Sequence, residues 1–292
     1  MNDERIFRLD PIGVRQSFDR ASTSYEAAAV LQARVADELL SRLDAFPLKP
    51  AVVLDLGAGP GRASAALKRR FRRSRVVALD LAPGMLSQAQ RRQRLFHRFD
   101  RVCADAARMP FIDASVDVIF SSLMLQWCDL DAVFGQVRRV LKPDGLFLFS
   151  SFGPDTLREL RAAWAQADNF NHVNQFMDMH DVGDALVRAG LMEPVLDVDR
   201  IQLTYADVLA LMRDLKVIGA HNVTAGRSRG LTGKTRLRSM TSAYEAFRRD
   251  GRLPATYEIV YGTSWGAAGR PAARAINGEI HISPSAIRRR SP

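Results

Sequence analysis

The chain has 292 residues, 47% hydrophobic and 25% charged, with a formal net charge of +10; this excludes a disordered or fibrous protein and fits one enlarged domain or a domain with an insertion. No run approaches the roughly 18 apolar residues of a membrane span, and the polar start MNDERIFRLD lacks the apolar core of a signal peptide, so we expect a cytoplasmic protein with no membrane partner. Cys103 and Cys128 fall in segments that we expect to be buried, and their spacing predicts neither a disulfide nor a metal site.

The first half of the chain predicts helices that lead into a buried sheet. Residues 12–44 have a helical pattern with a Ser/Thr break at 22–24. Nearly continuous apolar runs then predict strands covered on both faces, at residues 51–57, 75–81, 101–105, 116–122 and 145–151. Helical stretches lie between them, at residues 61–71, 84–96 and 129–145. This order predicts an α/β fold with a doubly wound, mostly parallel sheet.

The second half adds helices at residues 154–168 and 179–190 and two strands at 195–203 and 256–262, which makes seven strands in all. About fifty residues separate the last two strands, and an insertion of that length within a sheet connection is expected to be functional. We therefore expect four parts: an N-terminal helical cap at 1–48, an α/β core at 49–203, a helical insertion over the active site at 204–252, and C-terminal strands with a basic tail at 253–292.

A glycine-rich loop follows the first strand, in the stretch VVLDLGAGPG. In an open parallel sheet this first turn is the usual place for a cofactor, and Gly57, Gly59 and Gly61 would let the backbone approach it closely. Their spacing is G-x-G-x-G, and Arg62 stands where the dinucleotide fingerprint requires glycine. The loop therefore favours a cofactor other than NAD.

Three acidic residues stand at the ends of consecutive strands beside this loop. Asp80 is placed to accept hydrogen bonds from a ribose diol, and Asp105, followed by Ala106, could receive an adenine amino group. Taken singly, such an acid is more often a helix cap or a solvated turn. Together with Asp55 they favour an adenosine site.

Four stretches, VLDLGAGPGRAS, VVALDLAPGMLSQAQ, CADAARMPF and VDVIFSSLMLQW, resemble the successive motifs of class I S-adenosylmethionine-dependent methyltransferases over about residues 50–150. The resemblance implies a Rossmann-like fold and S-adenosyl-L-methionine as cofactor. The cofactor-binding residues that it implies are Asp55, Gly57, Ala58, Gly59, Gly61, Asp80, Leu81, Met85, Asp105, Ala106 and Leu123.

Further stretches, among them FDRASTSYEAAAVLQ, HVNQFMDMHDVGDAL and LPATYEIVYGTSWG, resemble the malonyl-acyl-carrier-protein O-methyltransferases nearly from end to end. This resemblance implies methylation of the free carboxylate of a malonyl thioester carried on acyl carrier protein, the step that opens pimeloyl synthesis for biotin. The carboxylate is ionised at neutral pH and is itself the nucleophile, so no general base is needed.

The same resemblance suggests residues that would hold the carboxylate: Tyr25, Gln126, His172, Asn174 and Arg213. We expect the largest contributions from Tyr25 and Arg213. Each has a structural alternative: Tyr25 could staple the N-terminal helix to the sheet, His172 could cap a helix or lie in the core, and Arg213 could be a surface residue. Trp127 is expected to pack in the core, with Gln126 better placed for the substrate.

The acyl carrier protein is acidic, which gives the charge of +10 a possible role in docking. The insertion would supply the docking residues Arg227, Arg229, Lys234, Arg236 and Arg238, unless they form an ordinary solvated surface. Nucleic acid is not an expected partner, because the basic clusters lack interleaved aromatic residues and no nucleic-acid-binding motif occurs. The sequence leaves the oligomeric state open.

Three other functions remain as alternatives. Assembly factors linked to arginine hydroxylation are similar to this family and share its C-terminal pattern, and the stretch LMLQW also resembles methyltransferases of small polycarboxylates of the trans-aconitate type. The insertion and the basic surface argue against the latter. A scaffold that does not catalyse is the third alternative, and the complete glycine loop with its three acids disfavours it.

Overall fold

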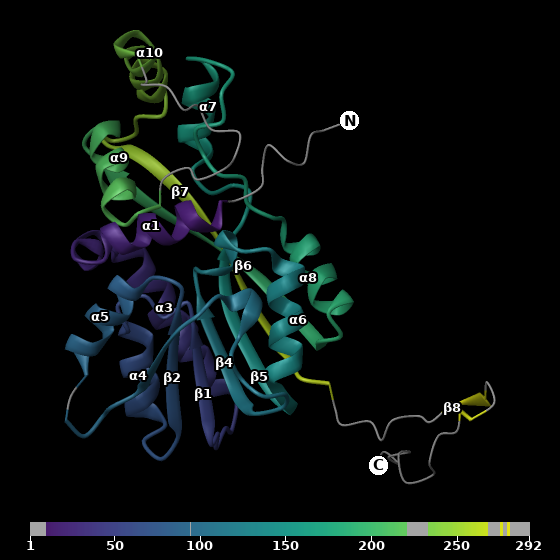
Figure 1. The fold of residues 1–292 in the computed structure, drawn as a ribbon. Helices are drawn as coiled ribbons and strands as arrows, with labels where there is room; N and C mark the ends of the chain where they lie inside the picture. The colour runs from purple at the N-terminus through teal and green to yellow at the C-terminus, as the bar shows by residue number, and fades with distance from the viewer. Residues whose placement is uncertain (1–9, 94, 221–232, 268–274, 277–278, 281–292) are drawn as a thin grey trace.

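The structure is a computed structural model that describes residues 10–93, 95–220, 233–267, 275–276 and 279–280 (Figure 1). Its centre is a seven-stranded sheet in the order β3-β2-β1-β4-β5-β7-β6, in which β7 runs antiparallel to both of its neighbours. The strands are β1 Val52–Leu56, β2 Arg75–Asp80, β3 Asp100–Cys103, β4 Val116–Ser122, β5 Leu141–Phe152, β6 Met192–Tyr205 and β7 Leu253–Trp265, with a separate pair β8 Ala275–Ile276 and β9 Glu279–Ile280. The predicted α/β class with a mostly parallel seven-stranded sheet is confirmed.

Helices cover both faces of this sheet. The α-helices are α1 Pro11–Ala21, α2 Tyr25–Ala28, α3 Val30–Arg42, α4 Arg62–Arg70, α5 Pro83–Arg92, α6 Leu130–Val140, α7 Arg158–Ala165, α8 Met179–Arg188, α9 Val208–Val217 and α10 Lys234–Glu245; short 3-10 helices are η2 Leu43–Ala45, η3 Ala106–Arg108 and η4 Leu125–Trp127. Alternate side chains of β1 enter opposite layers: Val53 packs with α3 and α4, and Leu54 with α6 and α8. The sheet is therefore buried on both sides, as its apolar strands predict.

Some predicted boundaries and burial states are wrong. The helix expected to run from 129 to 145 ends at Val140, and Leu141 already pairs with Val116 of β4. Pro143 disfavours a helical conformation at Lys142, which explains the early end. Cys103 is exposed rather than buried because β3 is the edge strand of the sheet.

The N-terminal helices and the insertion meet above the carboxyl edge of the sheet (Figure 1). The hydroxyl of Ser17 on α1 donates to the carbonyl of Gly219 at 2.8 Å, and that of Ser24 donates to the carbonyl of Val217 at 3.2 Å. Helix α10 packs on α7 at the far end of the long strands β6 and β7. These contacts build a cap in which α1 and α9 are neighbours. Within the described residues, no helix is both long and apolar enough to cross a membrane.

Two glycines give a matched test of the packing. Gly61 has φ +77°, and a Cβ there would lie 2.7 Å from the Cβ of Ala89, so we expect Gly61→Ala to lower the free energy of unfolding by about 1–3 kcal/mol. Gly135 lies in α6 with nothing within 4 Å of an added Cβ, so we expect Gly135→Ala to raise it by about 0.5–1 kcal/mol. Urea titrations of both variants measure the difference, and equal effects would contradict this packing.

Candidate functional site

Two small cavities open at the carboxyl ends of β1, β2 and β4, and we call them the cofactor cavities. Their volumes are about 290 and 110 Å³. Both are lined by Tyr25, Gly57, Gly59 and Ser122, so they meet along the glycine loop beneath α2. A side chain at Gly59 would find no atom within 4 Å and would project into this open space. The loop thus leaves room for a ligand against its backbone.

Asp80 fixes the shape of the glycine loop. Its carboxylate accepts the N–H of Gly59 and the N–H of Ala82, each at 2.8 Å. Burial raises the pKa of this carboxyl to about 6, although the two hydrogen bonds act in the opposite direction. The group is therefore poised to be stabilised in its charged form by a cationic ligand.

Asp55 lies at the floor of the larger cofactor cavity, 1% exposed, and accepts a 2.5 Å hydrogen bond from the hydroxyl of Ser64. Burial raises its pKa to about 7, and the charge of Asp80 adds to that rise. Asp105 lines the smaller cavity and accepts the N–H of Ala107 at 2.9 Å. A fourth acid, Glu26, lines the larger cavity and is paired with Arg92. The three acids without a cationic partner among the described residues, Asp55, Asp80 and Asp105, suit a ligand with positive charge and hydroxyl groups, as S-adenosylmethionine is.

The remaining cofactor residues suggested by the sequence divide into two groups. Most of them line a cofactor cavity: Ala58 the larger one, and Leu81, Met85, Ala106 and Leu123 the smaller one. Gly61 lines neither cavity. Gly61 precedes α4, and any side chain there would collide with Ala89 on α5. The close packing of α4 against α5 therefore explains why this residue is glycine.

A third cavity of about 680 Å³ adjoins the cofactor cavities, and we call it the acceptor cavity. Trp127 lines both it and the smaller cofactor cavity, and Gln32 lines both it and the larger one. Its wall is largely apolar, with Phe152, Leu157, Leu160, Trp164, Val173, Phe176, Met212, Leu215, Ile218 and Tyr257. Arg20 and Lys216 also line it, and among the described residues around it there is no Asp or Glu.

His172 and Asn174 both line the acceptor cavity. The ring of His172 stacks on Trp164 with centroids 3.7 Å apart, and its Nε2 lies 2.7 Å from Oδ1 of Asp168. Asn174 is 6% exposed, and its Oδ1 is buried without a hydrogen-bond partner. Of the two, Asn174 has the free polar atom that a ligand could use.

The other three suggested acceptor residues lie elsewhere. Tyr25 lines the cofactor cavities, where burial and the charge of Asp80 raise the pKa of its hydroxyl. Gln126 lines none of the three cavities, because its amide donates to the carbonyl of Leu123 at 2.7 Å. Arg213 is exposed on α9 and does not line the acceptor cavity. Trp127, expected to be a core residue, is the side chain that stands between the two ligand spaces.

Sequence reasoning missed Arg20, Gln32 and Lys216 as residues of the site. A signal was present for Arg20: the small residues Ser17 and Ala21 lie four apart on α1, which marks a helix face that another element can approach closely. Lys216 carries no comparable signal, because only the contact of α9 with α1 brings it to the cavity.

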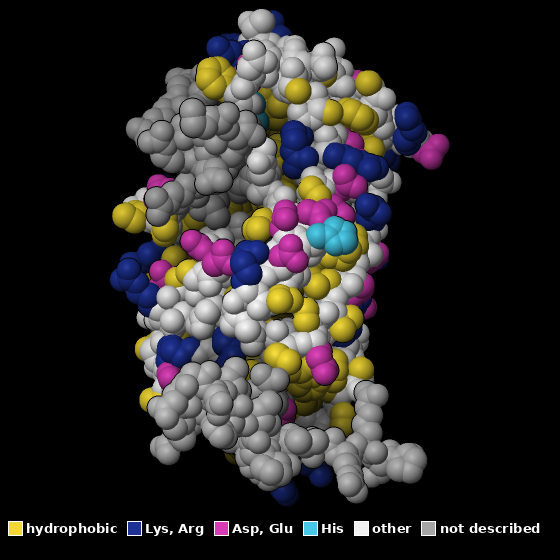
Figure 2. All heavy atoms as spheres, turned by 90° about the vertical axis from the view of Figure 1, so that its right-hand side faces the viewer, with side chains coloured by type: hydrophobic (Ala, Val, Ile, Leu, Met, Phe, Trp, Pro, Cys, Tyr) yellow, Lys and Arg dark blue, Asp and Glu magenta, His cyan; other side chains and the backbone are white. Residues whose placement is uncertain are grey.

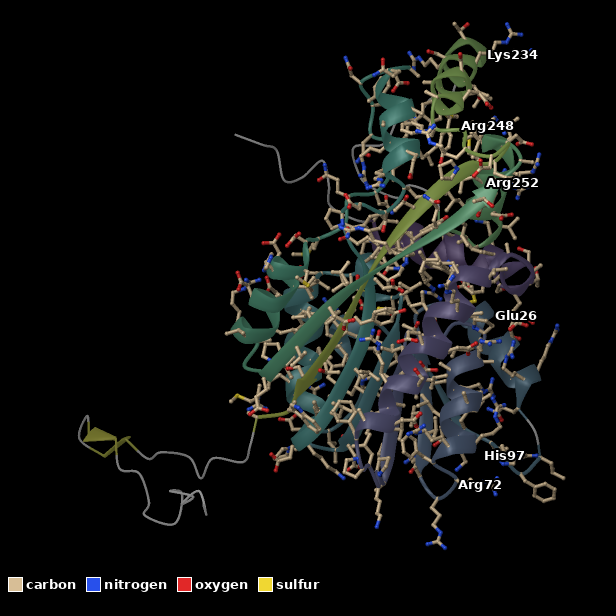
Figure 3. The ribbon with its side chains drawn as sticks, turned by 180° about the vertical axis from the view of Figure 1, so that it is seen from behind. Glu26, Arg72, His97, Lys234, Arg248 and Arg252 are labelled. Atoms are coloured by element: carbon tan, nitrogen blue, oxygen red, sulfur yellow. The ribbon has the colours of Figure 1, made fainter. Side chains whose placement is uncertain are left out.

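Basic residues gather at both ends of the molecule. Arg72 and His97, labelled in Figure 3, mark the turns after α4 and α5 at the end of the sheet opposite the cavities, whereas Lys234 lies at the other end on α10. On the face that carries α6 and α8, Figure 2 shows acidic and basic side chains intermixed. Arg72 and His97 thus lie away from the acceptor cavity, whereas Arg92 of the run 91–101 lines the larger cofactor cavity.

The raised pKa values of Asp55 and Asp80 predict a pH dependence of cofactor affinity. Both carboxyls bind protons below about pH 7 and 6, and a cationic ligand favours their ionised forms, so affinity should fall as pH falls. We expect S-adenosylmethionine to bind about tenfold more weakly at about pH 5.5 than at about pH 7.5 by calorimetry.

Asp80→Asn should weaken binding at the higher pH and flatten this dependence, while the exposed control Asp131→Asn should do neither. Asparagine is preferable to alanine because alanine would leave the N–H groups of Gly59 and Ala82 without their acceptor. Equal affinity of the unmodified chain at both pH values would contradict the assignment.

Comparison with known proteins agrees with this geometry. A family model described as a methyltransferase domain matches residues 54–149. Solved structures with the same fold include the YcgJ protein of Bacillus subtilis, with TM-score 0.56 and 17% identity over 80% of this chain and 99% of that one. Another is geranyl diphosphate C-methyltransferase from Streptomyces coelicolor, solved with S-adenosyl-L-homocysteine, with TM-score 0.50 and 16% identity over 80% of this chain and 79% of that one.

Full-length relatives are more similar. A malonyl-acyl-carrier-protein O-methyltransferase from a Methylovorus species is 53% identical over 275 residues, which is 92% of each chain. One from Laribacter hongkongensis is 51% identical over 96% of this chain and 98% of its own length. The chain therefore belongs to the malonyl-acyl-carrier-protein O-methyltransferase family.

Proposed function

We propose that this chain transfers a methyl group from S-adenosylmethionine to the free carboxylate of malonyl-acyl carrier protein. The observation that carries the proposal is the charge of the two adjoining spaces. The cofactor cavities are lined by Glu26, Asp55, Asp80 and Asp105, and their two cations are already paired, Arg62 with Asp37 and Arg92 with Glu26, whereas the acceptor cavity has Arg20 and Lys216 and no described acid. Cationic S-adenosylmethionine would bind on the acidic side of Trp127, and the anionic carboxylate would bind on its basic side. The names of the full-length relatives support the same reaction.

Bound S-adenosylmethionine supplies a methyl group on a positively charged sulfur. The chain's own task is to bring a carboxylate oxygen in line with that methyl group and to exclude water, because the ionised carboxylate needs no base. The acceptor cavity provides the dry surroundings through Phe152, Trp164 and Tyr257. Opposite charges that cancel during a reaction lose less solvation in such surroundings than in water.

The carboxylate and the thioester arm place different demands on the acceptor cavity. Asn174, buried with an unpartnered Oδ1, is suited to accept a hydrogen bond from an amide N–H of the arm. His172 is held by Asp168 and by stacking on Trp164, so we assign it to the shape of the wall. The product, a methyl ester, would serve as the apolar primer of pimeloyl and biotin synthesis that the family resemblance implies.

The relatives favour this function over the alternatives. Their similarity spans 90% or more of the chain and includes the insertion and the C-terminal strands. Each of these relatives is named a malonyl-acyl-carrier-protein O-methyltransferase, and none carries the name of an alternative.

The direct test is mass spectrometry of malonyl-acyl carrier protein after incubation with the enzyme and S-adenosylmethionine. We expect the mass of the acyl group to increase by that of one CH₂ unit, because a methyl group replaces the carboxylic hydrogen. The mass of acetyl-acyl carrier protein should not change, because it lacks the free carboxylate. Tight cofactor binding without any product on the malonyl carrier would overturn the proposal.

Carrier docking would use the exposed cations of α10, Lys234, Arg236 and Arg238; the other suggested residues, Arg227 and Arg229, lie outside the described residues. Arg236 also reaches Asp168 at 3.8 Å, so Lys234 and Arg238 are the cleaner pair to change.

We expect Lys234→Gln with Arg238→Gln to raise KM for the malonyl carrier by about threefold or more at low salt, an effect that added salt removes. The matched control is Arg72→Gln with Arg98→Gln, two exposed cations, which should leave KM unchanged; Arg72 and His97, the chain neighbour of Arg98, lie at the opposite end (Figure 3). A larger effect of the control pair would place the carrier at that end instead.

A further inference from the structure

We propose that Arg20 and Lys216 together recognise the free carboxylate of the acceptor. This inference rests on the proposed function and names two residues of that site. Both side chains line the acceptor cavity, Arg20 from α1 and Lys216 from α9. They replace Arg213, the cation suggested by the sequence, which lies one helical turn before Lys216 and faces solvent.

The two cations come from segments that are fastened together at the cavity. The hydroxyl of Ser17, three residues before Arg20, donates to the carbonyl of Gly219, three residues after Lys216. A Cβ at Gly219 would lie 3.1 Å from the Cβ of Ala21, which shows how closely the two segments approach. Arg20 and Lys216 are therefore held on one side of the cavity by the packing of α1 on the end of α9.

Both cations are available to a ligand. Neither forms an ion pair with a carboxylate among the described residues, whereas many other arginines of the chain do, for example Arg42 with Asp197 at 2.6 Å. Arg20 uses only its Nε, which donates to the carbonyl of Gln16 at 3.1 Å. Two unpaired cations around a cavity without a described acid create a positive potential that favours an anion.

Helix α1 also ties this basic side to the place of methyl transfer. Val14 and Phe18 of α1 line the smaller cofactor cavity, while Ser17, Arg20 and Ala21 line the acceptor cavity. Phe18 packs edge-on against Trp127, which both spaces share, with ring centroids 5.3 Å apart. A carboxylate held by Arg20 would therefore lie toward the cofactor, and the long apolar wall would remain for the thioester arm.

The chemistry predicts which kinetic constant these residues control. The attack forms a bond between a carboxylate oxygen and the methyl carbon and breaks the bond from that carbon to sulfur, whose electron pair stays on the sulfur; no proton moves. The negative charge of the carboxylate fades as the bond forms, so cations stabilise the bound acid more than the transition state. Their removal should raise KM without lowering kcat.

The test compares Arg20→Gln with Lys216→Gln, combined in one variant, with the matched control Arg213→Gln. With S-adenosylhomocysteine bound, we measure the affinities for malonyl- and acetyl-acyl carrier protein, which differ by the carboxylate. We expect the unmodified enzyme and the control to bind the malonyl carrier more tightly than the acetyl carrier. In the double variant, the ratio of the two affinities should fall by about tenfold. The KM of the double variant should rise by a similar factor, and its kcat should not fall.

Rescue and stability distinguish recognition from damage. Arg20 and Lys216 are exposed, so the double variant should keep the unfolding midpoint and the affinity for S-adenosylhomocysteine. Arg20→Lys with Lys216→Arg keeps both charges and should restore much of the preference.

Three results would overturn the inference: an unchanged preference in the double variant, a loss in Arg213→Gln instead, or equal weakening of both carriers, which would mean that the cations contact the carrier. If the unmodified enzyme methylates the malonyl carrier, any of these results removes only the assignment of Arg20 and Lys216. If it does not, the proposed function fails as well.

Discussion

The half-buried carboxylate of Asp80 makes the interactions on which the site depends. It ends β2, accepts the N–H groups of Gly59 and Ala82, and so holds the glycine loop open toward the ligand space. Asp80 lines the smaller cofactor cavity and Asp55 the adjoining larger one, and burial raises the pKa values of both carboxyls. Ionisation of these carboxyls is therefore unfavourable without a ligand, and a cationic ligand would stabilise their ionised forms. Because Asp80 also holds the glycine loop, the conformation of the loop is coupled to cofactor binding.

The opposite charge is supplied by a different part of the chain. The sheet and its first loops provide the acids, while α1 and the end of α9 bring Arg20 and Lys216 to an otherwise apolar cavity. Trp127 stands where the two spaces meet, held by Phe18 of α1. The anionic acceptor and the cationic cofactor would thus bind in separate cavities, and these cavities adjoin at Trp127.

The sequence predicted the sheet and most of the cofactor cavities because their signals are local. Asp55, Asp80 and the glycines follow strands directly, and parallel strands bring their carboxyl ends to one edge. The acceptor cavity depends on contacts between segments that are far apart in the sequence, such as Ser17 with Gly219, and no local sequence pattern predicts such contacts. The sequence therefore suggests Arg213 on α9 and gives no sign of Lys216, which lines the acceptor cavity from the same helix, and it does not indicate that Trp127 lines two of the cavities.

The most direct measurement is a crystal structure of the enzyme with S-adenosylhomocysteine and a malonyl thioester. We predict the nucleoside and amino acid portions against Asp80 and Asp55, the malonyl carboxylate next to Trp127, and the thioester arm along the apolar wall that includes Phe152 and Tyr257. A malonyl carboxylate that points to solvent or toward α10, away from Trp127, would contradict the account of two oppositely charged cavities that meet at one side chain.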